Sequence, residues 1–289
     1  MRKIDMHIHV AQSAVYKKDK LFVSEPGSML RHMDELGIEK AVLMSAGEGP
    51  ADLGSNNANR NICAWYPDRF LWMCNVDICD PNAVYDKLAD CKAQGAVGIG
   101  ELMQNRPLDD PFLQAVFAAA QKLRLPVTFH MSPEVGYNYG VVDHPGLPLL
   151  EQTLQKYPGV KFLGHSQPFW IEISGDAPTD PKGRNAWGKG PVAPGGALIR
   201  LFETYPNLYG DLSANSGARA IMRDEEFGIR FLEEYADRLL FATDMLNAEQ
   251  TMPLAGWMEE KLAEGKLSEE TCRKIFYKNA CCILSDPMV

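Results

Sequence analysis

Residues 3–10 read Lys-Ile-Asp-Met-His-Ile-His-Val and alternate polar with apolar residues as a β-strand does. Successive side chains on a strand point to opposite faces, so Asp5, His7 and His9 are expected to share one face, with the histidines near the carboxyl end. Buried charged groups need a partner or a metal ion. The stretch therefore predicts a first strand that carries half of a divalent-metal site. The alternative is a short polar strand with ordinary surface histidines.

Seven further apolar, β-rich runs follow, separated by stretches with the spacing of amphipathic helices. Strands are expected at residues 3–9, 40–44, 70–76, 97–102, 126–130, 160–164, 208–212 and 239–243, and helices at 27–36, 82–94, 110–123, 147–157 and 197–205. The chain from residue 253 onward predicts two or three closing helices. Eight strands that alternate with helices over 289 residues predict an α/β fold, the (β/α)8 TIM barrel, formed by residues 1–289 as one domain.

Residues 166–196 interrupt this rhythm, with many Gly, Pro, Asp and Trp residues and no clear period. They follow the sixth expected strand, and in a barrel the loops at that end overhang the active-site mouth. Loops of this length inside a compact domain are commonly functional. We interpret the segment as an inserted loop that acts as a lid or binds substrate; a plain surface insertion is the alternative.

Composition restricts the partners. The chain has 29 Lys and Arg against 38 Asp and Glu, a net charge of −9, and no basic run that could follow a phosphate backbone. Nucleic acids and anionic membranes are therefore not expected as partners. Met1 runs directly into the first expected strand and no apolar run has membrane-spanning length, so neither a leader nor a membrane span is expected. The seven scattered cysteines lack a CxxC pair, so reduced thiols are expected. These features predict a cytoplasmic protein with a small-molecule substrate, and they leave open whether it forms a homo-oligomer.

The strand ends carry the chemistry, because reactive residues of a barrel lie where strands end and loops begin. Imidazole and carboxylate groups gather there, and both suit Zn²⁺ and similar ions. The positions are His7 and His9 on the first strand, Glu101 on the fourth, His130 on the fifth, His165 on the sixth, Asp211 on the seventh and Asp244 on the eighth. Singly, His130 or His165 could be a core histidine, but together the set predicts a metal site. We expect His32 and His144 to be structural.

This pattern resembles the metal-dependent amidohydrolase superfamily, and within it the amidohydrolase-related branch of hydrolases, decarboxylases, hydratases and lactonases. The likeness is carried by residues 5–9, 126–130, 163–165, 205–213 and 240–244 and by the closing Asn279-Ala280. It implies that His7, His9, His130 and Asp244 hold a first metal ion. It further implies that His165 holds a second ion or polarises substrate and water, and that Asp244 moves the proton of the attacking water.

Glu101 departs from the pattern of several members of that branch, which have no carboxylate ligand at this point. TatD-type nucleases do carry Gly-Glu at the end of the corresponding strand. If Glu101 bridges two ions, His130 and His165 would hold the second; otherwise Glu101 orients a histidine through a hydrogen bond. We therefore expect one or two divalent ions, with zinc as the first choice and manganese as the alternative.

Substrate contacts are expected from Arg106, Arg184 and Arg219, which lie in or beside predicted loops near the mouth. A guanidinium binds a carboxylate bidentately, although each could equally be a solvated surface arginine. Trp170 and Trp187 are expected either to wall a small pocket or to pack residues 166–196. Asp211 is expected to support the site or to contact substrate.

The expected function is metal-dependent hydrolysis of a C–N or C–O bond in a small amide, cyclic amide or lactone, with Asp244 and His165 as catalytic residues. The alternative is a decarboxylase or hydratase that acts on an aromatic or unsaturated acid. A metal-dependent nuclease is suggested by Glu101 and opposed by the negative charge. A non-catalytic metal-binding barrel is opposed by the intact ligand set, although the fold alone decides none of these.

Overall fold

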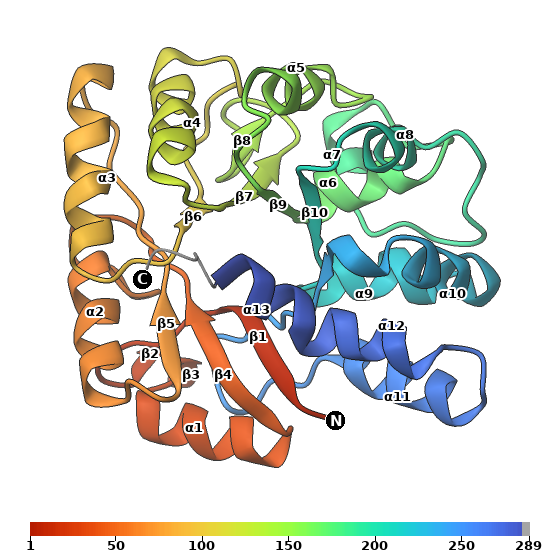
Figure 1. The fold of residues 1–289 in the computed structure, drawn as a ribbon, viewed down its shortest axis with the longest axis horizontal. Coiled ribbons are helices and arrows are strands. Elements are labelled where there is room, and N and C mark those ends of the chain that lie inside the picture. Colours follow the sequence, from red (N-terminus) through yellow and green to blue (C-terminus); the bar gives the residue numbers. More distant parts are fainter. Residues whose placement is uncertain (285–289) are drawn as a thin grey trace.

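The computed structural model describes residues 1–284, and its frame is a ring of parallel strands surrounded by helices (Figure 1). One sheet has the order β1–β4–β5, and the second has the order β6–β7–β9–β10–β11. The bounds are β1 (Lys3–Ile8), β4 (Ile38–Leu43), β5 (Phe70–Trp72), β6 (Ile99–Leu102), β7 (Val127–Ser132), β9 (Phe162–His165), β10 (Leu208–Asp211) and β11 (Leu239–Leu240). Each lies within or overlaps a predicted strand.

Isolated parallel bridges connect the two sheets on both sides. Cys74 pairs with Ile99, which links the end of β5 to β6, and Ile8 pairs with Met245, which links β1 to the segment after β11. Backbone hydrogen bonds of 2.7–3.0 Å accompany both bridges. The described strands thus close in chain order, the predicted TIM barrel is confirmed, and the carboxyl ends of its strands meet at one rim.

Helices cover the outside of the barrel. Several begin with proline in the first turn, where its missing N–H breaks no helical hydrogen bond, and Asp110 caps α4 by accepting from the Phe112 N–H at 2.8 Å. Between the strands lie α1 (Pro26–Glu35), α2 (Asn56–Trp65), η1 (Pro81–Ala83), α3 (Val84–Ala93), α4 (Pro111–Leu123), α5 (Pro148–Lys156), α8 (Ala197–Thr204), α9 (Ala214–Met222), α10 (Glu225–Glu234) and η3 (Ala236–Arg238). All five helices that we expected from the spacing are present.

The closing helices predicted from residue 253 onward are also present. They are α11 (Pro253–Ala263), α12 (Glu269–Arg273) and α13 (Asn279–Leu284), with the π-helical turn η4 (Lys274–Lys278) between the last two. Helix α13 contributes Ala280 and Ile283 to an apolar cluster inside the barrel, together with Ile4, Met6, Val42, Met44, Met73, Leu163, Leu240 and Ala242. This plug closes the end of the barrel opposite the rim.

The alternation that we predicted for residues 3–10 is wrong in part. Ile4 and Met6 belong to the cluster inside the barrel, whereas Ile8 packs outside it with the helices. The pairing of β1 with β4 is irregular between Asp5 and Ile8. A bulge of this kind shifts the register of a strand, so Met6 points inward although His7 and His9 also lie at the centre.

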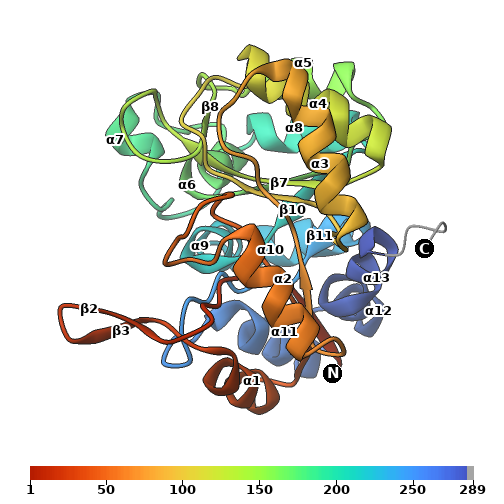
Figure 2. The same cartoon turned by 90° about the vertical axis from the view of Figure 1, so that its left-hand side faces the viewer.

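Two structural features were absent from the sequence prediction. The strands β2 (Val15–Lys17) and β3 (Lys20–Val23) form a hairpin that projects from the barrel (Figure 2), and β8 (Val141–Val142) pairs with β7. Residues 166–196 are also more ordered than their composition suggests: they contain α6 (Gln167–Trp170), η2 (Ile171–Ile173) and α7 (Pro181–Arg184). Phe169 and Trp170 of this segment are buried. Its role as a lid stays a prediction.

Within residues 1–284, no helix has the length and apolar character that crossing a membrane requires.

Candidate metal centre

Six side chains converge at the rim of the barrel. They are His7 on β1, His9 just beyond it, Glu101 on β6, His130 on β7, His165 at the end of β9 and Asp244 after β11. These are the six residues that the sequence predicts as metal ligands. Five of them are buried, while the side chain of Asp244 remains 25% exposed. Asp244 therefore lies on the side from which solvent or substrate reaches the cluster.

His7, His9 and Asp244 surround a common point. Asp244 Oδ1 lies 3.5 Å from His7 Nε2 and 3.4 Å from His9 Nε2, and Glu101 Oε2 lies 3.8 Å from each nitrogen. Ligands held at about 2.0–2.2 Å by a tetrahedral ion are separated by about 3.3–3.6 Å. His7 Nε2 is also buried without a hydrogen-bond partner. Both the spacing and the unpaired nitrogen fit a divalent cation.

The other carboxylate oxygen of Glu101 faces a second group. His130 Nδ1 lies 3.1 Å and His165 Nε2 2.9 Å from Glu101 Oε1, and the two nitrogens are 3.0 Å apart. One proton cannot form hydrogen bonds between all three pairs of these atoms at once. A metal ion, in contrast, can accept a lone pair from each of the three atoms. Glu101 thus lies between two groups of ligand atoms, as a bridging carboxylate would. The Gly100–Glu101 peptide bond is cis.

Neighbouring groups hold the histidine rings in place. His7 Nδ1 lies 2.7 Å from Asp211 Oδ2, and His9 Nδ1 lies 3.3 Å from the Leu53 carbonyl oxygen, so each ring turns its Nε2 toward the cluster. Such partners fix the ring orientation of metal-binding histidines and raise their basicity. Asp211, for which the sequence left two roles open, thus supports His7.

Ser213 performs the corresponding task for His165. Its hydroxyl oxygen lies 2.9 Å from His165 Nδ1, and its backbone N–H donates to Asp211 Oδ1 at 2.9 Å. A hydroxyl can donate or accept. The Ser213 hydroxyl is therefore compatible with two states of His165. In the first, His165 binds a metal through Nε2 and donates its Nδ1–H to Ser213. In the second, Nδ1 accepts from Ser213 and Nε2–H donates to another group.

Asp5 ties the first strand to the loop that carries Asp244. Its carboxylate accepts from the Thr243 hydroxyl at 2.6 Å and from the backbone N–H groups of Thr243 and His7, both at 3.0 Å. Burial raises the pKa of Asp5 to about 7, against the opposing effect of these hydrogen bonds. Asp5 consequently acts on the centre through the backbone of its neighbours.

Charge in the cluster favours a cation. Burial opposes the charged form of His7, but the carboxylates of Asp211, Asp244 and Glu101 outweigh it and raise the pKa of His7 to about 10. Burial likewise opposes ionisation of Glu101, yet hydrogen bonds from His130 and His165 hold its pKa well below the usual range. The pKa of Asp244 is lowered too, against burial, chiefly by His7. The carboxylates of Glu101 and Asp244 are therefore held in the ionised form, and a proton on His7 stands where a metal could bind.

The three predicted substrate arginines do not join the cluster. The half-buried Arg106 pairs with Asp110 at 2.9 Å, and Arg219 stacks over Trp187 with its Cζ 4.5 Å from the ring centroid. Arg184 is buried, and its Nη1 donates at 2.8 Å to the carbonyls of residues 133 and 143. Arg184 thus joins residues 166–196 to the loop after β7. A substrate contact stays a prediction for all three.

One residue beside the centre escaped the sequence prediction. Tyr139 lies over His130, with ring centroids 4.5 Å apart, and is 56% exposed. Burial of its hydroxyl, then the carboxylates of Glu101 and Asp244, raise the pKa of Tyr139 to about 12. No spacing signal could have revealed it, because Tyr139 follows β7 in an irregular loop.

Fold and site together define a class of protein: a TIM barrel with a histidine–carboxylate centre at the carboxyl rim. The model of the amidohydrolase family matches residues 4–283. The chain therefore belongs to the amidohydrolase family, as the resemblance in its sequence predicted.

Solved structures of similar fold cover nearly the whole chain. An uncharacterised TIM-barrel protein from Bordetella bronchiseptica is 16% identical with a TM-score of 0.64, and 98% of each chain is covered. A dihydroxybenzoic acid decarboxylase from Polaromonas, solved with bound manganese and 2-nitroresorcinol, is 19% identical with a TM-score of 0.60, covering 98% of this chain and 96% of that chain. A probable 2-pyrone-4,6-dicarboxylic acid hydrolase from Acinetobacter baumannii is 17% identical with a TM-score of 0.55, covering 98% and 99%. No curated protein matches the sequence.

Proposed function

We propose that this protein is a metal-dependent hydrolase that cleaves a C–N or C–O bond in a small amide, cyclic amide or lactone. The observation that carries the proposal is the buried, unpartnered Nε2 of His7, which faces Asp244 and Glu101 across 3.5 and 3.8 Å. A buried polar atom without a partner is rare and calls for an unseen ion or water. The surrounding imidazoles and carboxylates are ligands that divalent ions prefer.

The residues divide the work by position. His7, His9 and Asp244 would hold a divalent ion, and Glu101 would link it to a second ion on His130 and His165. A divalent ion bound there polarises a substrate oxygen and makes water more acidic, from a pKa of about 15.7 to about 7. Asp244 is ionised and is the partly exposed member, so it takes the proton from water and returns it to the leaving group. His165, held by Ser213, orients substrate if it is free of metal.

Zinc is the ion that we propose first, because three nitrogen and oxygen ligands around an open fourth position are typical of catalytic zinc. Manganese is the alternative, since the same donors bind it and the similar Polaromonas decarboxylase holds manganese. Either ion would be held by the same side chains.

Decarboxylation of an aromatic acid is the second candidate, favoured by the similarity to a dihydroxybenzoic acid decarboxylase. The same centre could bind such an acid through its carboxylate and an adjacent hydroxyl. The two candidates differ in their demand for water, because hydrolysis consumes one molecule of water and decarboxylation releases carbon dioxide.

A paired assay separates the candidates. Metal-loaded protein is incubated with a panel of lactones and cyclic amides, followed by acid release, and with a panel of hydroxybenzoates, followed by carbon dioxide release. We expect ring opening that Asp244→Asn abolishes and that Asp52→Asn, an exposed carboxylate paired with Lys17, leaves unchanged. Carbon dioxide release with no ring opening would replace the hydrolase by the decarboxylase.

A further inference from the structure

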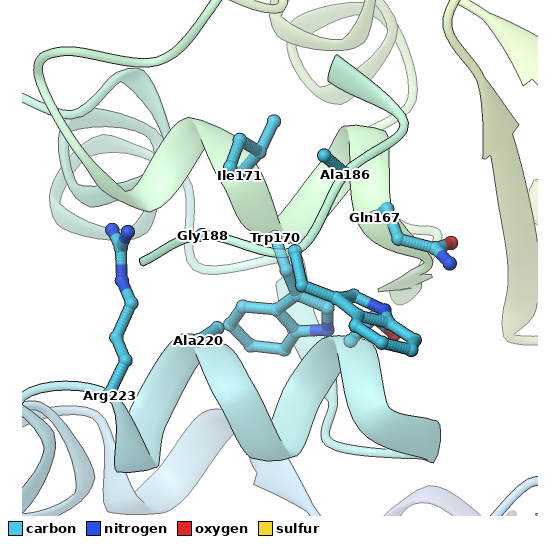
Figure 3. Close-up of a pocket in the computed structure, with 9 residues that line it drawn as sticks. Gln167, Trp170, Ile171, Ala186, Gly188, Ala220 and Arg223 are labelled. Carbon is cyan, nitrogen blue, oxygen red and sulfur yellow. The ribbon is translucent and has the colours of Figure 1, made fainter. Parts of the chain in front are cut away.

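A crevice lies between residues 166–196 and helix α9, outside the metal cluster. Its narrow end is lined by Gln167, Trp170, Ser216 and Ala220, and its wide end, with a volume of about 340 Å³, by Ser174, Asp176, Pro178 and Lys189. Ile171, Ala186, Trp187, Gly188 and Arg223 border both ends. Figure 3 shows Gln167 near one end of this face of α9 and Arg223 at the other.

The crevice runs along α9 and starts close to the metal centre. Ser216, Ala220 and Arg223 are spaced by four and three residues, so they share one face of the helix. The helix begins directly after Ser213, whose hydroxyl contacts His165, and Gln167 lies two residues beyond His165. From Ser213 to Arg223 the helical rise is about 15 Å. The narrow end, with a volume of about 10 Å³, has room for about one water molecule, so the wide end beside Arg223 is the part that could hold an organic molecule.

Arg223 carries polar atoms that the protein leaves unpaired. Its Nε and Nη2 are buried without hydrogen-bond partners, and Nη1 makes a single long contact of 3.4 Å with the Lys189 carbonyl oxygen. Among residues 1–284, no carboxylate oxygen lies within ion-pair distance of its guanidinium, although Asp176 and Asp224 lie near enough to act on its charge. Unpaired buried N–H groups are costly, so they point to an unseen acceptor.

The walls indicate what the acceptor belongs to. Ile171, Ala186 and the indole of Trp187 offer apolar surface, and Lys189 adds a second cation at the wide end. The carboxylate of Asp176 lines the same end and accepts a hydrogen bond from the Ser174 hydroxyl. Its negative charge disfavours a ligand that carries more than one negative charge. A planar guanidinium fits a carboxylate bidentately. The volume lies within the lower range of small-molecule sites.

We propose that the wide end of this crevice binds the carboxylate of a small organic acid with an apolar body, with Arg223 as its anchor. The narrow end separates this site from the metal centre, so the inference goes beyond the proposed function and does not require the bound acid to be the substrate. Arg223 is not one of the three arginines that the sequence predicts as substrate contacts.

A binding experiment tests the subsite without turnover. Phenylacetate and its neutral counterpart phenylacetamide are titrated by calorimetry into metal-free and metal-loaded protein, for the wild type, Arg223→Gln and Arg230→Gln. Arg230 is the matched control, because it is exposed on α10 and does not line the crevice. We expect phenylacetate to bind metal-free wild type and Arg230→Gln alike, and Arg223→Gln to bind about tenfold or more weakly.

Gly188→Ala provides a second variant that retains the arginine. A β-carbon at this position would lie 2.3 Å from Arg223 Nη1 and would push the guanidinium aside. It should weaken phenylacetate binding as well, and it decides the matter if Arg223→Gln fails to fold. Equal affinity of wild type and the folded variants, or equal binding of phenylacetamide, would overturn the subsite. Failure of the hydrolase assay with intact phenylacetate binding would overturn only the proposed function.

Discussion

Replacing Glu101 by glutamine is expected to weaken metal binding at the centre by at least about a hundredfold. Glu101 Oε1 lies 2.9 Å from His165 Nε2 and Oε2 lies 3.8 Å from His7 Nε2, so its two oxygens serve two groups. Glutamine has one side-chain oxygen, so its NH2 group must face either His165 or His7, and that histidine loses its neighbouring oxygen. Removing one member of a buried charge pair costs about 3–5 kcal/mol. At about 1.4 kcal/mol for each factor of ten, this gives a loss between about a hundredfold and several thousandfold.

The assay is a zinc titration in competition with a chromophoric chelator at pH 7.5, with elemental analysis of ions per chain. Glu172→Gln is the matched control, because Glu172 is also buried but faces Arg184 instead of the cluster. Two ions in the wild type and one in Glu101→Gln would establish a bridge. One ion in both, with an affinity like that of the control, would refute the reasoning and leave Glu101 as a partner that orients His130 or His165.

Three further predictions test the surroundings of the centre. The pKa of His7 is raised to about 10 in the metal-free protein, so a metal ion must displace a proton from His7 at neutral pH. Calorimetry in buffers of different ionisation enthalpy should therefore record about one proton released per ion bound. The metal affinity should rise by up to about tenfold per pH unit from about pH 6 to 9. An affinity that does not vary with pH would contradict this. Ser213→Ala removes the hydroxyl beside His165 and should lower kcat/KM for any hydrolysed substrate about 2- to 13-fold, whereas Ser28→Ala on α1, whose hydroxyl contacts Glu25, should not. Arg184→Met should lower the free energy of unfolding, measured in urea, by about 3–5 kcal/mol, because it leaves two buried carbonyl oxygens and the Glu172 carboxylate without their partner. An unchanged free energy of unfolding would contradict this structural role and leave substrate binding as the role of Arg184.

The position of the candidate centre follows from local sequence to a large degree. Parallel strands in a barrel end at one rim, so a histidine or carboxylate at the end of an expected strand must lie near the others. That argument placed His130, His165 and Glu101 together although they are far apart in sequence. The eight strands could also be predicted from the sequence, because apolar β-rich runs and helical spacing are local signals.

Other features depend on contacts that no local pattern encodes. The bulge in β1 places Met6 inward, against strict alternation, because pairing with β4 sets its register. The partner of His9 is a backbone carbonyl in an irregular loop, which carries no residue-type signal. Arg184 and Arg223 look alike in the sequence, and both leave Nε and Nη2 without a hydrogen-bond partner. Arg184, however, is buried and its Nη1 donates to two backbone carbonyls at 2.8 Å, whereas Arg223 lines a cavity and its Nη1 makes one contact of 3.4 Å. Burial and partners separate them, and both are properties of the folded chain.

The most direct test of a metal-dependent centre is the ion content of the gently purified protein, compared with that of a His7→Ala, His9→Ala double variant. Our account predicts at least one zinc or manganese ion per wild-type chain, and its loss in the variant with the fold intact by circular dichroism. A wild-type protein that binds no ion, even after zinc or manganese is added, would contradict it.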